Sequence, residues 1–266
     1  MVDKENKSAV SRLLGIARST IYYVSKKDKK DWIQKGIIEE VLRLHPTYGS
    51  RRVADHLQMN RKPIQRVMQK FGIKARRRRR AKKYSKTKVS TIYANLLVAT
   101  IPSYPHHIWA ADFTEVWFQG KWVYIATVID LYTREILGVA VSLKKGAQLT
   151  IQALYNALLH HPRPEIFHSD NGSEYDAGAF VEILINLNIL ISRSHPGCPW
   201  ENGYQESFYD KFKLMLGDPH ICKSLGELVA AIYRTIHYYN TNRIHSALKM
   251  PPRVFARRLQ ESTMKL

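Results

Sequence analysis

One of the longest apolar runs in the chain extends from Trp122 to Ile129. It is far shorter than the roughly 18 apolar residues that a membrane-spanning helix needs. A strand this apolar is expected to be covered on both faces, which places it inside a sheet between layers of helices. The run therefore indicates a strand that is covered on both faces.

The segments around this run complete the α/β pattern. Three strands in succession, followed by alternating helix and strand, are typical of a mixed sheet flanked by helices. We assign this core to residues 105–266, within a chain of 266 residues that is long enough for two modest domains. The predicted strands are Ile108–Phe118, Lys121–Asp130, Glu135–Leu143, Glu165–His168 and Ile189–Ser192, and the predicted helices are Ala147–His161, Ala177–Asn188, Pro199–Leu216 and Leu225–Asn240.

Residues 31–74 are predicted to form a small all-α domain of three helices. The first helix ends at a His45–Gly49 break, the second starts near Ser50, and Asn60 is a plausible cap for the third. The polar face of the third helix suits the recognition helix of a helix-turn-helix unit, although a small bundle with a solvated face is the alternative. That face carries Arg61, Lys62, Gln65, Arg66 and Gln69.

Residues 1–30 contain a second pattern of helix, glycine-containing turn and helix, between Ser8 and Tyr23. This pattern is consistent with a partial helix-turn-helix hairpin whose beginning is missing. An amphipathic hairpin with no role in DNA binding explains it equally well.

The positive charge of the chain is concentrated at one end. The net charge is +20, and residues 1–90 hold 26 basic and 7 acidic side chains, against 16 and 15 in residues 91–266. Such an excess favours a polyanionic partner such as nucleic acid or an anionic membrane surface. We assign residues 75–104 to a basic linker, in which Arg76, Arg77, Arg78, Arg79 and Arg80 are predicted to contact phosphates; a solvated linker is the alternative.

The remaining composition points to a cytoplasmic protein with no membrane partner. Cys198 and Cys222 are too few for a disulfide framework, although a single bridge between them is possible. The N-terminal residues lack the apolar core of a signal peptide.

Two aspartates fall at chemically informative places in the predicted sheet. Asp112 lies inside an apolar strand, where a carboxylate is costly unless it is paired or bound to a metal. Asp170 directly follows a short strand, at the edge of the sheet where ligand sites in α/β folds usually lie.

A third carboxylate is sought on the helix after Pro199. With Phe208 at zero and about 100 degrees per residue, Tyr204, Phe212 and Met215 define an apolar stripe. Asn202, Glu206 and Lys213 then share a separate polar face at about 120 to 160 degrees, with Asp210 as a competitor near 200 degrees. Spacing favours Glu206, because 57 residues lie between Asp112 and Asp170 and 35 between Asp170 and Glu206.

Three converging carboxylates offer hard oxygen ligands with high negative charge. Such a set suits Mg²⁺, or Mn²⁺ in its place, better than zinc. Two such ions can activate an attacking hydroxyl at a phosphodiester and stabilise the leaving oxygen. The predicted chemistry is metal-dependent phosphoryl transfer on DNA, against the alternative that each acid is an ordinary surface or capping carboxylate.

The chain resembles the DDE transposases and integrases with a ribonuclease H-like core, and among them the bacterial insertion sequences of the IS-three group. The words that carry the resemblance are WxxDxT from Trp109, VIDLYTREILGVAVS from Val128, HSDNGSEY from His168, NGxxE from Asn202 with Lys213 seven residues after Glu206, and YYNTNRIHSAL from Tyr238. It covers residues 8–258, and the 35-residue gap is a hallmark of the family.

The resemblance implies specific roles for these residues. Asp112, Asp170 and Glu206 would be the catalytic residues and hold two Mg²⁺ ions, while Asn202 and Lys213 would contact the DNA end. Hydrolysis at the end of the element would free a 3′-hydroxyl that attacks target DNA. A homo-oligomer on DNA is expected, as is fusion or partnership with a helix-turn-helix protein from an upstream reading frame.

The sequence departs from retroviral integrases in lacking their N-terminal His-His-Cys-Cys zinc module. The mixed set His195, Cys198, His220 and Cys222 straddles the predicted catalytic helix, so we do not expect zinc there. Two rival functions remain open at this point: a DNA-binding regulator or inhibitor of transposition without catalysis, and a structure-specific nuclease.

Overall fold

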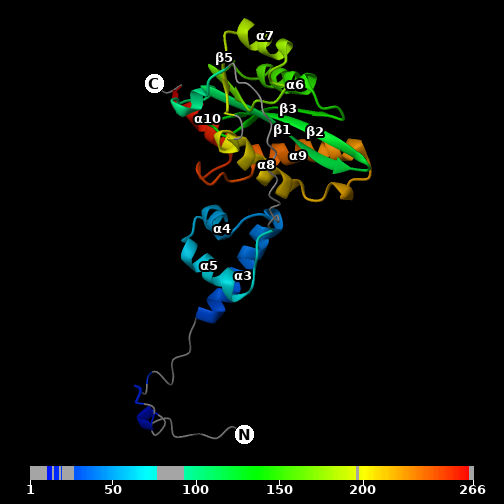
Figure 1. The fold of residues 1–266 in the computed structure, drawn as a ribbon. Coiled ribbons are helices and arrows are strands. Elements are labelled where there is room, and N and C mark those ends of the chain that lie inside the picture. Colours follow the sequence, from blue (N-terminus) through cyan, green and yellow to red (C-terminus); the bar gives the residue numbers. More distant parts are fainter. Residues whose placement is uncertain are drawn as a thin grey trace. The chain divides into compact units, whose positions relative to one another are not determined.

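The computed structural model describes residues 11–13, 15–17, 19, 27–76, 93–195 and 198–263. The chain divides into two compact units, one ending at Ala75 and the other beginning at Arg76. Figure 1 shows the elements of each unit. Most of the predicted 1–30 hairpin lies outside the described residues, as does the part of the basic segment that holds Arg77, Arg78, Arg79 and Arg80.

Within residues 27–75, the first unit contains the helices α3 (Lys27–Leu44), α4 (Ser50–Leu57) and α5 (Arg61–Lys70). Their apolar sides meet in a small core that includes Ile38, Val41, Val53, Ile64 and Val67. The three-helix arrangement matches the prediction, but α3 begins before the predicted domain boundary. Asn60 occupies the N-cap position of α5 as expected, although its side chain forms no capping hydrogen bond.

The second unit is built on a five-stranded sheet of order β3-β2-β1-β4-β5. Strands β1 and β2 are antiparallel, as are β2 and β3, whereas β4 runs parallel to β1 and to β5. This mixed sheet with flanking helices confirms the predicted α/β class. The strands are β1 (Ile108–Phe118), β2 (Lys121–Asp130), β3 (Ile136–Ser142), β4 (Ile166–Ser169) and β5 (Leu190–Arg193).

Helices cover both faces of this sheet (Figure 1). Helices α8 (Gly203–Leu216) and α9 (Leu225–Thr241) pack on the face that carries Ile108 and Ala110 of β1. Helices α6 (Ala147–Leu158) and α7 (Gly178–Asn186) pack on the opposite face, against Trp109 and Ala111. The burial of β2 between these two layers explains its almost uninterrupted apolar sequence.

Several boundaries differ from the prediction. The helix predicted from Pro199 is a 3-10 turn, η2 (Pro199–Asn202), followed by α8. Helix α10 (Pro252–Thr263) and the short turns η1 (Leu96–Val98) and η3 (Pro219–Ile221) were not predicted. Part of the predicted linker belongs to the core unit, because the Leu96 amide donates to Ser192 Oγ at 2.9 Å.

No helix in the described part of the chain is long and apolar enough to cross a membrane.

Candidate active site

The register of the sheet brings Asp112 and Asp170 together. Ala110 of β1 pairs with His168 of β4, and these strands are parallel. Asp112 lies two residues beyond Ala110 on β1, and Asp170 directly follows Ser169, the last residue of β4. The charge of Asp170 is close enough to raise the pKa of Asp112. Two residues with 57 others between them in the sequence therefore lie close together, where β4 ends beside β1.

The surroundings of Asp112 oppose its negative charge. Burial is the main cause that raises the pKa of this carboxyl well above its ordinary value, and Asp170 and Glu206 raise it further. The Phe113 amide donates to Asp112 Oδ1 at 2.7 Å and, with the positive charge of Lys213, acts in the opposite direction. Burial and the neighbouring carboxylates therefore oppose the ionisation of Asp112 more strongly than the Phe113 amide and Lys213 favour it.

Asp170 lies in a loop in which its carboxylate contacts Gly172. The Gly172 amide donates to Asp170 Oδ1 at 3.0 Å. A Cβ atom at Gly172 would lie 3.0 Å from Asp170 Oδ1 and 3.0 Å from Glu174 Oε2, so both carboxylates face this glycine. Burial chiefly raises the pKa of Asp170, with a further contribution from Glu174, whereas the Gly172 amide, Arg193 and Lys145 lower it.

Glu206 lies in the first turn of α8, where negative charge is favourable to the helix dipole. Its side chain is exposed, and its charge acts on Asp112. The rotation of α8 differs from the prediction, because Tyr204 is 39% exposed and the buried face carries Gln205, Phe208, Tyr209 and Phe212. The buried face is polar as well as apolar because backbone carbonyls of β1 and β2 lie opposite it.

The two other residues assigned to the DNA end occupy different environments. Lys213 is partly buried on α8 and close enough to Asp112 to lower the pKa of its carboxyl. Asn202 is 7% exposed, and its Nδ2 donates to the Ala111 carbonyl at 3.4 Å. Asn202 therefore connects η2 to β1, and a DNA contact would need it to become more exposed.

The donor set at this edge consists of oxygen atoms. Within the described ranges, no three His, Cys, Asp or Glu side chains are close enough together to hold a metal ion as they stand. Asp112 and Asp170 nevertheless fit a hard divalent cation, because both are partly buried carboxylates and each has a neighbouring carboxylate whose charge raises its pKa. Glu206, at the start of α8, is the third candidate ligand.

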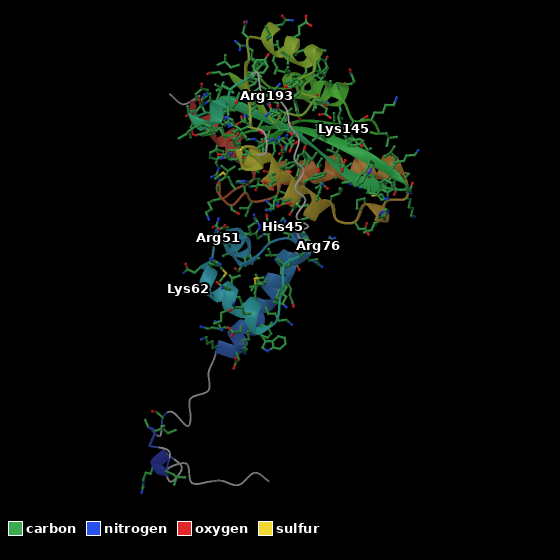
Figure 2. The ribbon with its side chains drawn as sticks, viewed as in Figure 1. His45, Arg51, Lys62, Arg76, Lys145 and Arg193 are labelled. Atoms are coloured by element: carbon green, nitrogen blue, oxygen red, sulfur yellow. The ribbon has the colours of Figure 1, made fainter. Side chains whose placement is uncertain are left out.

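Sequence reasoning missed the charged residues that support the loop after Asp170. Arg193 is 1% exposed and donates from Nη2 to the Tyr175 carbonyl at 2.7 Å. Lys145 lies 3.0 Å from the buried Glu174 carboxylate and 4.6 Å from the centre of the Phe113 ring. Both cations belong to the core unit (Figure 2). The sequence signal that could have pointed to them is the motif HSDNGSEY, which contains their partners Glu174 and Tyr175.

In the helical unit, α5 presents part of the predicted DNA-binding face. Arg61, Lys62 and Gln69 are exposed and Gln65 is partly buried; Figure 2 labels Lys62. Arg66 instead forms two hydrogen bonds with Asp31 of α3, at 2.5 and 2.6 Å, and the Asp31 carboxylate is 1% exposed. Arg66 therefore links α5 to α3 through its guanidinium, while its side chain remains 39% exposed.

Comparison with known proteins identifies the family. Two integrase core domain families match residues 102–199 and 187–252. The chain is 28% identical to the transposase InsF of insertion sequence IS3A from Escherichia coli K12, covering 90% of this chain and 89% of that protein. It is 30% identical to the InsK protein of insertion sequence element IS150 from the same strain, covering 90% of this chain and 88% of that protein. The chain belongs to the IS3-family insertion-sequence transposases.

The transposase also resembles solved integrases in its fold. Its similarity to the HTLV-2 integrase catalytic core domain, solved in complex with magnesium, has a TM-score of 0.50 at 20% identity. The match covers 57% of the transposase and 97% of that chain. The likeness concerns the fold alone.

Proposed function

We propose that this IS3-family transposase cleaves the ends of its insertion sequence and joins them to target DNA, with Asp112, Asp170 and Glu206 as the catalytic residues. The observation that supports the proposal is the parallel pairing of β1 with β4, beyond which Asp170 is close enough to Asp112 to raise the pKa of its carboxyl. Helix α8 adds Glu206, whose charge acts on Asp112. The spacing of the same three residues along the chain resembles that of the catalytic residues in the family.

Mg²⁺ is the proposed cofactor, as two ions held by Asp112, Asp170 and Glu206, with Mn²⁺ able to substitute. When bound, the ions would supply charge stabilisation to the attacking and leaving oxygens of a phosphodiester. The role of the protein is to hold the carboxylates at the edge of the sheet. The Phe113 and Gly172 amides, which donate to Asp112 and Asp170, restrain the orientation of these side chains.

DNA binding is assigned mainly to residues outside the neutral core. We propose that Arg61, Lys62, Gln65 and Gln69 of α5 contact DNA and that Arg76 to Arg80 track phosphates. Lys213 would contact the DNA end beside the carboxylates. Asn202 would support that contact from η2, and Arg66 would act indirectly by holding α5 in place.

The assembly and location of the protein are further proposals. Recombination joins two element ends to one target, which favours a homo-oligomer on DNA. The family resemblance adds fusion or partnership with an upstream-frame helix-turn-helix protein. Both described cysteines, Cys198 and Cys222, are free, which is compatible with the reducing bacterial cytoplasm.

A strand-transfer assay with Asp112→Asn tests the proposed function. The full chain is incubated with Mg²⁺ and oligonucleotides bearing the candidate ends of the element. We expect Asp112→Asn to reduce joining on the order of a thousandfold or more while DNA affinity stays unchanged, because the variant removes a metal ligand and leaves every phosphate contact in place. Glu115→Gln is the matched control, since Glu115 is an exposed acid on the same strand.

The products separate the rival functions. Joined strands that depend on Asp112 support a transposase. Cleavage without joining would indicate a structure-specific nuclease, and DNA binding by the wild-type protein without either product would indicate a regulator. Undiminished joining by Asp112→Asn would contradict the assignment of the site.

A further inference from the structure

Helix α8 faces the sheet with two buried polar side chains. Gln205 is 0% exposed and Tyr209 is 7% exposed, and they lie one residue before and three residues after Glu206. Gln205 Nε2 donates to the Ala110 carbonyl at 2.7 Å and to the Thr127 carbonyl at 3.3 Å. The Tyr209 hydroxyl donates to the Asp112 carbonyl at 2.6 Å.

Thr127 connects these two side chains. Its Oγ1 lies 2.8 Å from the Tyr209 hydroxyl and 3.2 Å from Gln205 Oε1. Thr127 is also the cross-strand partner of Asp112 in the pairing of β1 with β2. One buried network therefore joins α8 to the two central strands, and it includes the backbone of Asp112 itself.

Such a network restricts the helix more than apolar packing does. Phe208 and Phe212 also bury their rings under α8, but apolar contacts are not directional and tolerate small shifts of a helix. Hydrogen bonds need heavy-atom distances near 3 Å and good angles, and a buried polar group that loses its partner is costly. Sliding or rotating α8 would break bonds at both Gln205 and Tyr209.

We propose that Gln205 and Tyr209 are positioning residues that hold Glu206 at the place beside Asp112 that metal binding requires. The inference rests on the proposed function of these carboxylates. Tyr209 links the backbone of one proposed ligand, Asp112, to the helix that carries another, Glu206. Neither Gln205 nor Tyr209 needs to touch DNA or the metal for this role.

Tyr209→Phe tests the proposal, because it removes the hydroxyl and keeps the ring that packs 5.2 Å from Phe208. We expect kcat for strand joining to fall about 10- to 100-fold while KM for the DNA end stays within about twofold, since the loss is one of orientation. The Mg²⁺ concentration for half-maximal activity should rise. Tyr204→Phe is the matched control, because it removes an exposed hydroxyl from the same helix and should leave all three quantities unchanged.

A second variant asks whether the two side chains act as one network. Gln205→Met keeps the length of the side chain and removes its amide. If both bonds fix a single position of α8, the double variant should lose little more joining activity than the more impaired single variant. Fully additive losses would contradict a shared role.

Two further readouts separate failure of this inference from failure of the proposed function. Binding of Mg²⁺ is followed by the rise in melting temperature that it causes, which should be smaller in Tyr209→Phe than in Tyr204→Phe. Amide hydrogen exchange in residues 203–206 should be faster in Tyr209→Phe than in the control.

Activity and folding together decide between the two proposals. Wild-type joining with an equally active Tyr209→Phe would overturn the inference and leave the proposed function intact. A loss of activity that only follows a lower fraction of folded protein would overturn it as well. If the wild-type protein neither joins DNA nor gains stability from Mg²⁺, the proposed function fails, and hydrogen exchange still decides whether Gln205 and Tyr209 restrain α8.

Discussion

Individual charged residues in this transposase owe their properties to partners that are far away in the sequence. Asp31 and Arg66 are 35 residues apart and form a bidentate pair between α3 and α5. The hydrogen bond from Arg66 is the largest cause that holds the pKa of Asp31 below its ordinary value, and Lys70 adds to it. Two of the basic side chains of α5, Arg66 and Lys70, are thus paired with Asp31 inside the helical unit.

This pair predicts how the helical unit responds to acid. A carboxyl whose pKa is lowered by folding contributes stability above its ordinary pKa, near 3.8, and loses it as the pH falls toward the folded value. We expect the melting temperature of the helical unit to fall below about pH 4, and Asp31→Asn to lower it at neutral pH while flattening that acid limb. Asp28→Asn is the control, because Asp28 is exposed and pairs only at the surface. Calorimetry from pH 2 to pH 7 measures the melting temperatures of both variants. If the melting temperature of Asp31→Asn falls below about pH 4 as steeply as that of the wild type, the Asp31–Arg66 pair is not the cause of the acid sensitivity.

His161 predicts a second pH dependence, in the core unit. Burial chiefly lowers its pKa from 6.5 to about 4, with the positive charges of His106, Arg253 and His160 acting in the same direction. The unfolded chain therefore binds a proton below pH 6.5 that the folded chain does not, so stability should fall between pH 6.5 and pH 4. His161→Gln should weaken this dependence in thermal unfolding measured across that range, whereas His160→Gln, at an exposed position, should retain it.

Secondary-structure elements approach one another closely where small residues permit it. Strand β3 and helix α6 meet at Gly138, where a Cβ atom would lie 2.1 Å from the Ala153 carbonyl oxygen and 2.9 Å from the Ala157 Cβ. No rotamer change can relieve a clash with backbone atoms. The α6 layer therefore lies at a distance from the sheet that glycine alone permits.

Gly138→Ala should separate these two elements. We expect a loss of about 1 to 3 kcal/mol or more in the free energy of unfolding, as for other overpacked cores. Gly178→Ala is the control: Gly178 begins α7 with open space around it, so alanine should be neutral or stabilise by up to about 1 kcal/mol. Urea denaturation of both variants compares them, and an equal stability of the two would show that β3 and α6 can move apart without cost.

At the scale of the whole molecule, the charge and the carboxylates are divided between different parts of the chain. Residues 1–90 hold 26 of the 42 basic side chains, whereas the core that carries Asp112, Asp170 and Glu206 is close to neutral. An acidic edge repels phosphate unless cations neutralise it. We therefore assign most of the attraction to DNA to the first third of the chain and the chemistry to the rest.

This division predicts two different effects on DNA binding. Replacing Arg76 to Arg80 by glutamine should weaken binding to all sequences and make the dependence of log affinity on log salt shallower, by about 0.9 for each phosphate that is no longer neutralised. Gln65→Ala should instead change the preference between sequences, by about 1 to 3 kcal/mol at the base pair it reads, and leave the salt slope unchanged. Titrations at several salt concentrations test both, and an unchanged slope after the arginine replacements would identify that segment as a plain linker.

The sequence by itself determined the class of fold and the ends of its main strands. The predicted limits of β1 and β2 agree with the structure, because a buried strand bounded by the Gln119–Gly120 turn leaves little choice of register. It also indicated Asp112, Asp170 and Glu206 through their spacing and flanking words. Local periodicity is sufficient to place the strands because it depends on neighbours in the chain, whereas the three acids were indicated by their spacing and by the family resemblance.

Only the tertiary structure decided which side chains meet. The rotation of α8 buries Gln205 and exposes Tyr204 because carbonyl groups of β1 and β2 accept hydrogen bonds there, and these acceptors are distant in sequence. The same reason applies to Arg66, which the sequence places on an outward face and the structure pairs with Asp31. A buried polar group is stable only where a partner lies within bonding distance, and that distance is set by the packing of elements rather than by the order of residues.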